Sequence, residues 1–300
     1  MMRVPKKLVS FWGKGGVGKT TLSSAVAVSL SKMGYRTYLL SSDFVPSLQD
    51  VLGVELSREP LELSENLVVD QLFEEKVIEM WKERFGEEVY RVASSIFPVG
   101  REIIDYVAGA PGIVEEFTLY YIYELYRNED FDVLVWDTMA TGGGLRMLRI
   151  EKEFYDHLGE AVKLYLRVKG VIDRIRTGSE DPLKLIESWR ELAQKVLDFL
   201  RGSHHVASLV SRSLPVDYYV ATRVYRELLE FGIPVKMLFV NMVSGSAEEN
   251  LYFKKFYDSF GEKLTLLRVP RVDPSPRGID SLSKLLEKND VDTILSLLEG

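Results

Sequence analysis

Residues 13–20 read Gly13-Lys14-Gly15-Gly16-Val17-Gly18-Lys19-Thr20, and this stretch decides the fold of the chain. It fits the phosphate-binding pattern G-x-x-x-x-G-K-[ST]. The apolar residues 7–12 come directly before it, as expected of a buried parallel strand, and residues 20–33 place apolar side chains on one helical face. A strand, a glycine loop and a helix in this order predict a P-loop, whereas a glycine turn without a ligand would give Lys19 and Thr20 no role.

The residue types in this loop suit the phosphates of a nucleotide. Glycine permits backbone conformations that other residues avoid, so successive N–H groups can point at phosphate oxygens beside the start of the helix. Lys19 can reach the β- and γ-phosphates, and the Thr20 hydroxyl can hold Mg²⁺. We therefore predict that a nucleotide and Mg²⁺ bind here, with the nucleotide held by Gly13, Gly15, Gly16, Val17, Gly18, Lys19, Thr20 and Thr21.

Lys14 adds a second cation that an ordinary P-loop does not need. The run resembles the deviant P-loop of the family that includes the chromosome-partitioning and division-site ATPases, nitrogenase iron protein and the arsenite-pump ATPase. In that family the early lysine crosses a dimer interface and contacts the nucleotide of the partner, in the manner of an arginine finger. The resemblance implies a homodimer in which Lys14 is catalytic, and the alternative is a solvated loop cation.

Apolar strands alternate with helical segments along much of the chain. This alternation predicts an α/β fold with a doubly wound, mostly parallel sheet, in which ligands lie at the carboxyl ends of the strands. Asp43, Asp137 and Asn241 lie at such ends, although both aspartates could instead cap helices and Asn241 could be a turn residue. The predicted strands after the first cover residues 38–42, 131–137, 206–210, 235–241 and 264–269.

Two long stretches depart from this alternation and are helical in pattern. Residues 73–126 are rich in aromatic side chains, and residues 154–200 repeat apolar side chains at helical spacing. We therefore expect a single domain over residues 1–300 with an inserted α-helical subdomain. The predicted nucleotide-binding core comprises residues 1–53, 131–150 and 205–300, and the predicted helical subdomain comprises residues 54–130 and 151–204.

Residues 137–148, named here the second switch, narrow the resemblance to the ArsA family. They read D-T-M-A-T-G-G-G-L-R-M-L, where the family has D-T-A-P-T-G-x-x-L-R-x-L. Residues 111–115 resemble its P-G-x-x-E segment, and residues 270–278 resemble its loop beside the nucleotide. This family contains the arsenite-pump ATPase and the factor that delivers tail-anchored membrane proteins. The resemblance implies that Asp137 joins Thr20 at the metal, that Asn241 reads adenine and that Pro270 flanks the nucleotide.

The first switch, residues 43–48, departs from the family. The usual D-P-A-H-[SN]-L becomes D-F-V-P-S-L, so the proline has moved and the histidine is absent. The resemblance implies that Asp43 is the catalytic residue that orients the attacking water. The two changes leave open slow or differently gated hydrolysis.

Composition excludes several classes of protein. The 300 residues are 46% hydrophobic and 28% charged, which is typical of a globular chain with an ample core. No signal peptide or long uncharged apolar stretch occurs, so we expect a cytoplasmic protein without a membrane span. A net charge of -7 argues against nucleic-acid binding. The absence of cysteine excludes thiolate metal sites and thiol capture of arsenite. In lacking a CxxC pair, the chain resembles an archaeal-type ArsA homologue.

The nucleotide is expected to be ATP, because no N-K-x-D motif for guanine occurs. Together these features predict an ATP-hydrolysing dimeric switch that binds and delivers an apolar client, such as a tail-anchored membrane protein. An apolar transmembrane helix would then bind the helical subdomain, whose apolar stripes are otherwise ordinary core. Two alternatives remain: a spatial organiser like the partitioning and division-site ATPases ParA and MinD, and a slow, nucleotide-locked scaffold.

Overall fold

The sheet that carries the P-loop has eight strands in the order β3-β4-β2-β5-β1-β6-β7-β8. Every neighbouring pair is parallel except β3 with β4, which confirms the predicted doubly wound, mostly parallel sheet. The structure, a computed structural model, describes residues 6–175 and 182–299. The strands are β1 Lys7–Trp12, β2 Thr37–Ser41, β3 Leu61–Ser64, β4 Leu67–Gln71, β5 Val133–Asp137, β6 His205–Arg212, β7 Val235–Val243 and β8 Thr265–Pro270.

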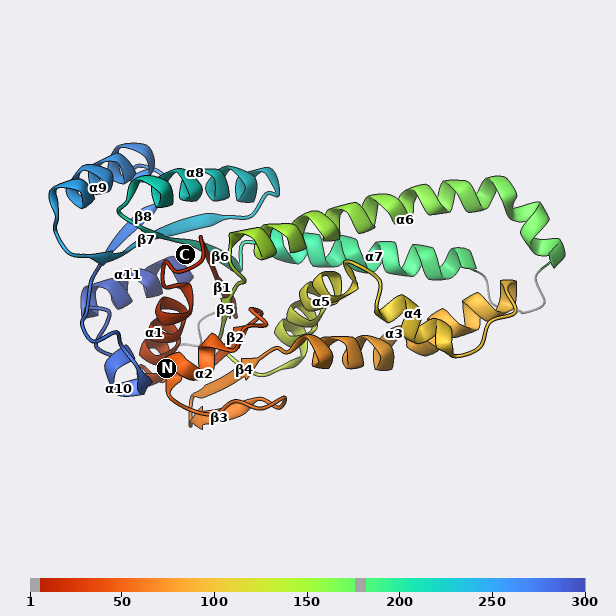
Figure 1. The fold of residues 1–300 in the computed structure, drawn as a ribbon, viewed down its shortest axis with the longest axis horizontal. Coiled ribbons are helices and arrows are strands. Elements are labelled where there is room, and N and C mark those ends of the chain that lie inside the picture. Colours follow the sequence, from red (N-terminus) through yellow and green to blue (C-terminus); the bar gives the residue numbers. More distant parts are fainter. Residues whose placement is uncertain (1–5, 176–181, 300) are drawn as a thin grey trace. The chain divides into compact units, whose positions relative to one another are not determined.

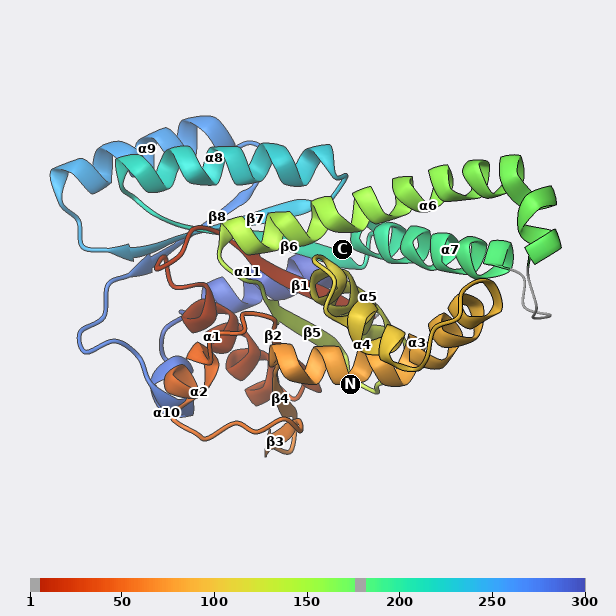
Figure 2. The same ribbon diagram turned by 45° about the vertical axis from the view of Figure 1, so that its right-hand side comes forward.

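Helices cover both faces of this sheet (Figure 1). α8 and α9 pack together on one face, whereas α1 packs with α2, α10 and α11 on the other, and Figure 2 shows the same layers from a second direction. The main hydrophobic core joins Leu22 and Val26 of α1 to Phe11, Leu39 and Val135 of the central strands. These helices are α1 Lys19–Lys32, α2 Ser47–Leu52, α8 Pro215–Glu230, α9 Ala247–Phe260, α10 Gly278–Leu282 and α11 Lys288–Glu299.

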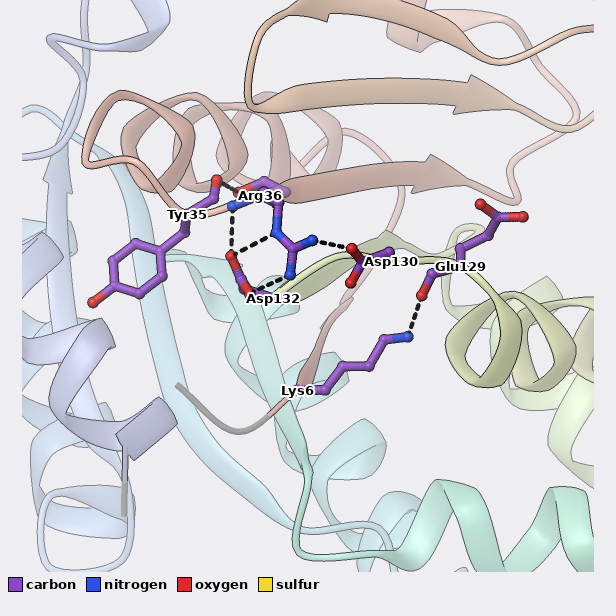
Figure 3. A network of polar contacts seen from close by, with 7 residues as sticks. Lys6, Tyr35, Arg36, Glu129, Asp130 and Asp132 are labelled. Carbon is purple, nitrogen blue, oxygen red and sulfur yellow. Dashed lines mark hydrogen bonds and ion pairs between the residues drawn. The ribbon is translucent and has the colours of Figure 1, made fainter. Parts of the chain in front are cut away.

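A network of charged side chains joins the amino ends of the three central strands β1, β2 and β5 (Figure 3). Arg36, just before β2, donates its backbone N–H and its Nη2 to the carboxylate of Asp132, just before β5, both at 2.9 Å. Arg36 also pairs with Asp130, and Lys6, just before β1, donates to the backbone oxygen of Glu129. The network lies at the end of the strands opposite the P-loop, and partly exposed ion pairs of this kind add little stability.

The remaining helices form a second compact unit around a cluster of aromatic rings. The ring of Phe85 lies 5.4 Å from Tyr120, 5.7 Å from Trp189 and 6.0 Å from Phe117, measured between centroids. Within residues 6–175 and 182–299, no helix is both long and apolar enough to cross a membrane. The helices are α3 Glu74–Ile96, α4 Glu102–Ala108, α5 Ile113–Asn128, α6 Thr141–Ile175 and α7 Pro182–Arg201.

The boundary between the two units differs from the predicted one. The sheet unit comprises Met1–Leu72, Asn128–Leu145 and Arg201–Gly300, and the helical unit comprises Phe73–Arg127 and Arg146–Leu200. The prediction that residues 54–72 belong to the helical part is therefore wrong, because they contain β3 and β4. Both strands are short, and β3 alternates half-buried with exposed side chains, so the sequence carries no long apolar run there. Residues 146–150 likewise belong to the helical unit, because α6 continues through them.

The helical unit contains two buried glutamates whose charges repel one another. Glu116 lies on α5 and Glu151 on α6, and both side chains are shielded from solvent. Among the described residues, neither carboxylate oxygen of Glu151 has a hydrogen-bond partner. Burial raises the pKa of Glu116 from 4.5 to about 8, and burial together with the charge of Glu116 raises the pKa of Glu151 well above 4.5. The pair therefore favours a protonated state when the protein is folded.

We predict that this pair makes folding less stable as the pH rises. A folded-state pKa above the unfolded value contributes stability below the unfolded pKa, and that contribution is lost as the pH rises through the folded pKa. Glu151→Gln removes one charge, so it should raise the Tm at about pH 9 and flatten the dependence of Tm on pH from about pH 5 upward. Thermal melts across this range test the prediction, with the exposed Glu153→Gln on the same helix as control. An unchanged pH dependence in Glu151→Gln would contradict it.

Candidate functional site

The P-loop connects β1 to α1 with backbone conformations that require glycine. Gly16 and Gly18 have φ angles of 77° and 92°, in the left-handed region that other residues rarely adopt. At Gly13 a Cβ atom would lie 2.2 Å from the carbonyl oxygen of Val210 in β6, so only glycine fits against that neighbouring strand. α1 begins at Lys19, directly after Gly18. The loop therefore leads into a helix N-terminus, as a phosphate cradle needs.

Three side chains place opposite charges at the base of this loop. Lys19 is buried, and burial lowers the pKa of its ammonium group, while Asp137 and Asp43 raise it in part. Asp137 is fully buried at the end of β5, and burial raises its pKa to about 6. Hydrogen bonds from the hydroxyls of Thr20 and Ser41, together with the charge of Lys19, oppose that rise. Asp137 is therefore a carboxylate whose charge is costly unless a cation lies beside it.

The donor atoms at this point fit a hard cation such as Mg²⁺. In the part of the chain that the structure describes, Asp137 Oδ1 and Thr141 Oγ1 are shielded from solvent yet have no hydrogen-bond partner. Asp137 Oδ2 accepts from Ser41 Oγ at 3.1 Å, so Oδ1 is the oxygen left for a ligand. Mg²⁺ prefers carboxylate, hydroxyl and phosphate oxygens. Thr20 and Asp137, which we predicted as metal-binding residues, therefore lie together with a suitable oxygen uncommitted.

The first switch is held close to the second. Trp136 donates its indole N–H to Ser42 Oγ at 2.9 Å, and the backbone N–H of Ser42 donates to Asp137 O at 3.0 Å. The Asp43 carboxylate accepts from the backbone N–H of Val45 at 3.2 Å, which closes a turn within the switch. Asp43 does not cap a helix, because α2 begins at Ser47 with Pro46 before it. The helix-cap alternative for Asp43 is therefore excluded.

The second switch is fastened to β1 and to the P-loop. The Thr138 hydroxyl donates to the carbonyl of Phe11 at 2.6 Å, and the backbone N–H of Thr141 donates to the carbonyl of Gly13 at 3.1 Å. The ring of Trp12 lies against Gly144, where a Cβ atom would come within 3.0 Å. Hydrogen bonds therefore connect the second switch directly to β1 and to the first residue of the P-loop.

A cavity of about 270 Å³ opens beside Thr21 at the start of α1. Asn241 and Pro270, both predicted nucleotide-binding residues, line it together with Met242, Arg271 and Ser275. The amide of Asn241 donates to the carbonyl of Val17 at 2.9 Å, so this residue also braces the P-loop. Met242 has a φ of 57°, a conformation that non-glycine residues adopt mainly where the structure imposes it. Two residues predicted to bind the nucleotide, Asn241 and Pro270, therefore line one cavity at the start of α1.

Lys14 is engaged within its own chain. Its ammonium group lies 2.9 Å from Oδ1 of Asp217, on the first turn of α8, and the other oxygen of Asp217 accepts from Arg212 Nε at 2.6 Å. The Asp217 side chain is 1% exposed, and the hydrogen bonds from Arg212 and Lys14 hold its pKa below its usual value despite burial. Lys14 is therefore not a free loop cation here, and its charge is balanced by a buried carboxylate.

Several of these residues were not found from sequence. Asp217 lies 203 positions from Lys14, and Gln71, which contacts the first switch, ends a strand that we did not predict. No spacing rule could have joined them to the P-loop. Met242 could have been found from sequence, because it directly follows Asn241, which we had predicted to bind the nucleotide.

Comparison with known proteins agrees with this geometry. Residues 6–285 match the sequence profile of the anion-transporting ATPase family, ArsA. A protein of Aquifex aeolicus named as arsenical pump-driving ATPase 2 is 32% identical over 254 residues, covering 81% of this chain and 82% of its own. The ATPase ASNA1 homolog of Dictyostelium discoideum is 24% identical and covers 94% of this chain. The ATPase GET3 of Malassezia globosa is also 24% identical and covers 92% of this chain. These relatives are covered over 88% of their own length. With its P-loop, its second switch and a matching profile over residues 6–285, this protein belongs to the ArsA family of ATPases.

Proposed function

We propose that this ATPase is a dimeric switch that binds and delivers an apolar client, such as a tail-anchored membrane protein. ATP and Mg²⁺ would bind at the P-loop of each subunit, and Lys14 would contact the phosphates of the partner's nucleotide. The observation that supports the shared site is the exposure of Lys14: its side chain is 38% exposed at the P-loop although Asp217 holds its ammonium group at 2.9 Å. Lys14 would have to leave Asp217 to reach the partner's nucleotide. The proposal places the protein in the cytoplasm.

The residues divide the work of hydrolysis among them. Lys19 and the P-loop N–H groups bind the phosphates, and Thr20 with Asp137 would hold Mg²⁺, which supplies positive charge to the phosphate oxygens when bound. Asp43 orients the attacking water. Ser42 directly precedes the first switch and donates its backbone N–H to the carbonyl oxygen of Asp137 in the second switch, so a change at the first switch on hydrolysis would reach the second through this bond. In other nucleotide-dependent switches, hydrolysis likewise removes contacts that hold the switch segments in one conformation.

A transmembrane helix is a better client than an arsenical for this chain. Some relatives are named as arsenical pump-driving, but the sequence contains no cysteine with which to capture arsenite as a thiolate complex. The helical unit instead exposes large apolar side chains. On α6, Leu164 and Leu166 are 61% and 55% exposed, and on α4 Tyr106 is 79% exposed. Contact with an apolar helix would remove these side chains from water, which favours binding.

The exposed and buried leucines of this unit give opposite predictions. Leu166→Ala should leave the Tm nearly unchanged, because the side chain already faces solvent, but should weaken capture of a transmembrane peptide. Leu197→Ala on α7 should lower the free energy of unfolding by about 2–5 kcal/mol, because Leu197 is buried. Leu185 and Leu192, also on α7, are only partly buried and should lie between the two.

The proposed function is tested by co-purification of the wild-type protein with a tail-anchored protein, in the presence of ATP and of ADP. We expect capture that depends on the nucleotide and that falls in Leu166→Ala, while Leu197→Ala loses stability. No capture by the wild-type protein in either nucleotide would contradict client delivery, and equal capture by Leu166→Ala would exclude this face of α6.

A further inference from the structure

Gln71 ends β4 and touches the first switch from the neighbouring strand. It lies opposite Ser41 in the parallel register of β2 and β4, and it is 1% exposed. Its amide nitrogen donates to the carbonyl oxygen of Asp43 at 2.6 Å and to that of Leu72 at 3.0 Å. The buried side chain of Gln71 therefore holds the backbone of Asp43, the residue proposed to orient water.

The orientation of this amide is fixed by its neighbours. Both groups that Nε2 contacts are carbonyl oxygens, which cannot donate a hydrogen bond, so the amide cannot turn its own oxygen toward them. As a consequence Gln71 Oε1 is shielded from solvent and has no partner in residues 6–175 and 182–299. A buried acceptor without a partner costs free energy. A methionine of similar size would avoid this cost, but it would also leave the carbonyl oxygens of Asp43 and Leu72 without this donor.

The contact holds Asp43 at a point where the backbone is otherwise irregular. The backbone N–H of Asp43 donates to Ser41 Oγ at 3.4 Å, and its carbonyl accepts from Gln71. Both ends of this residue are thus tied to β2 and β4, which are buried strands. With the two peptide groups fixed, the direction of the Asp43 carboxylate is restricted to the rotamers of one side chain.

We propose that Gln71 is a positioning residue for ATP hydrolysis, which holds the backbone of Asp43 so that its carboxylate meets the attacking water. This inference rests on the role given to Asp43 in the proposed function, and it does not depend on the client. Displacing a catalytic group by about 1 Å can lower a rate by about 100-fold. Gln71 touches no phosphate-binding residue of the P-loop in the hydrogen bonds described, so its effect should fall on kcat.

The test compares Gln71→Met with Gln71→Glu in the full chain. For Gln71→Met we expect kcat to fall by about 10- to 100-fold, with the Kd for ATP unchanged by calorimetry and the protein still folded at the assay temperature, although loss of the two hydrogen bonds lowers the Tm. Gln194→Met, at a glutamine of α7 whose amide bonds the side chain of Asp198, is the control and should keep full activity. A merely structural role would instead lower Tm and ATP affinity together.

Gln71→Glu adds a readout that only the hydrogen bond to Asp43 should produce. The introduced carboxyl can donate to the Asp43 carbonyl when protonated but repels it when ionised, so its kcat relative to wild type should rise as the pH falls. The charged groups near this end of the sheet are Asp137, Asp43 and Lys19. Dividing the kcat of the variant by the kcat of the wild type at each pH removes the effect of their own titration.

Two outcomes would overturn the inference, and they are distinguishable with Asp43→Asn assayed beside them. If Asp43→Asn is inactive but Gln71→Met stays within about twofold of wild type, Gln71 does not position Asp43 although the site is correct. If Asp43→Asn hydrolyses ATP normally, the role of Asp43 fails and the inference fails with it.

Discussion

Lys19→Ala is expected to abolish measurable ATP binding. The Lys19 ammonium lies buried at the start of α1, near the carboxylates of Asp137 and Asp43, whereas the other lysine of the loop, Lys14, is paired with Asp217. A charge-assisted bond in such a buried place contributes more than one at the surface, so we expect affinity to fall by at least about 100-fold. The change also leaves the buried Asp137 without its balancing charge.

Isothermal titration calorimetry with ATP and Mg²⁺ measures this directly. Lys32→Ala is the matched control, because Lys32 lies on the same helix but is exposed and donates only to Ser283 Oγ in the hydrogen bonds described. A Kd near the wild-type value for Lys19→Ala would refute the assignment of residues 13–20 as the phosphate site.

Asp43→Asn is expected to keep ATP affinity and to lose hydrolysis. Asparagine has nearly the same shape, and the hydrogen bonds made by the backbone of Asp43 to Ser41 and Gln71 are preserved. What is lost is the negative oxygen that accepts a proton from water, and general-base catalysis contributes about 100- to 10,000-fold. We therefore expect kcat to fall by that range with little change in Kd.

Phosphate release measured at saturating ATP tests this expectation. Asp50→Asn, an exposed aspartate on α2 just after the first switch, should hydrolyse ATP at the wild-type rate. Normal turnover by Asp43→Asn would show that another group orients the water.

The altered first switch has a structural consequence at its far end. Pro46, displaced from its usual place in the family motif, lies directly before α2, which begins at Ser47. Proline fixes φ and suits a position at the start of a helix. Ser47 Oγ lies 3.5 Å from the hydroxyl of Thr20, so the start of α2 reaches the residue expected at the metal. The changed motif therefore still connects the switch to the P-loop.

The parts of the site that could be predicted from sequence are those encoded locally. The P-loop and both switches are continuous runs of residues, and the parallel sheet follows from apolar strands that are buried on both faces, as in β1, β2 and β5. The rest depends on packing between distant segments. Asp217 reaches Lys14 because α8 follows β6, which lies beside β1. Gln71 reaches Asp43 because β4 pairs with β2, and β4 was missed for want of a long apolar run.

The shared site is the central claim, and a mixed dimer tests it most directly. Co-expressed, differently tagged copies carrying Lys14→Ala and Asp43→Asn can be purified as a heterodimer, and its ATPase activity compared with each parent. If Lys14 acts across the interface, one of the two sites keeps both an intact Asp43 and a Lys14 from the partner. The heterodimer should then regain about half of the wild-type kcat, while both parents stay inactive. If the heterodimer is as inactive as its parents, Lys14 acts within its own chain and the account of a shared site is wrong.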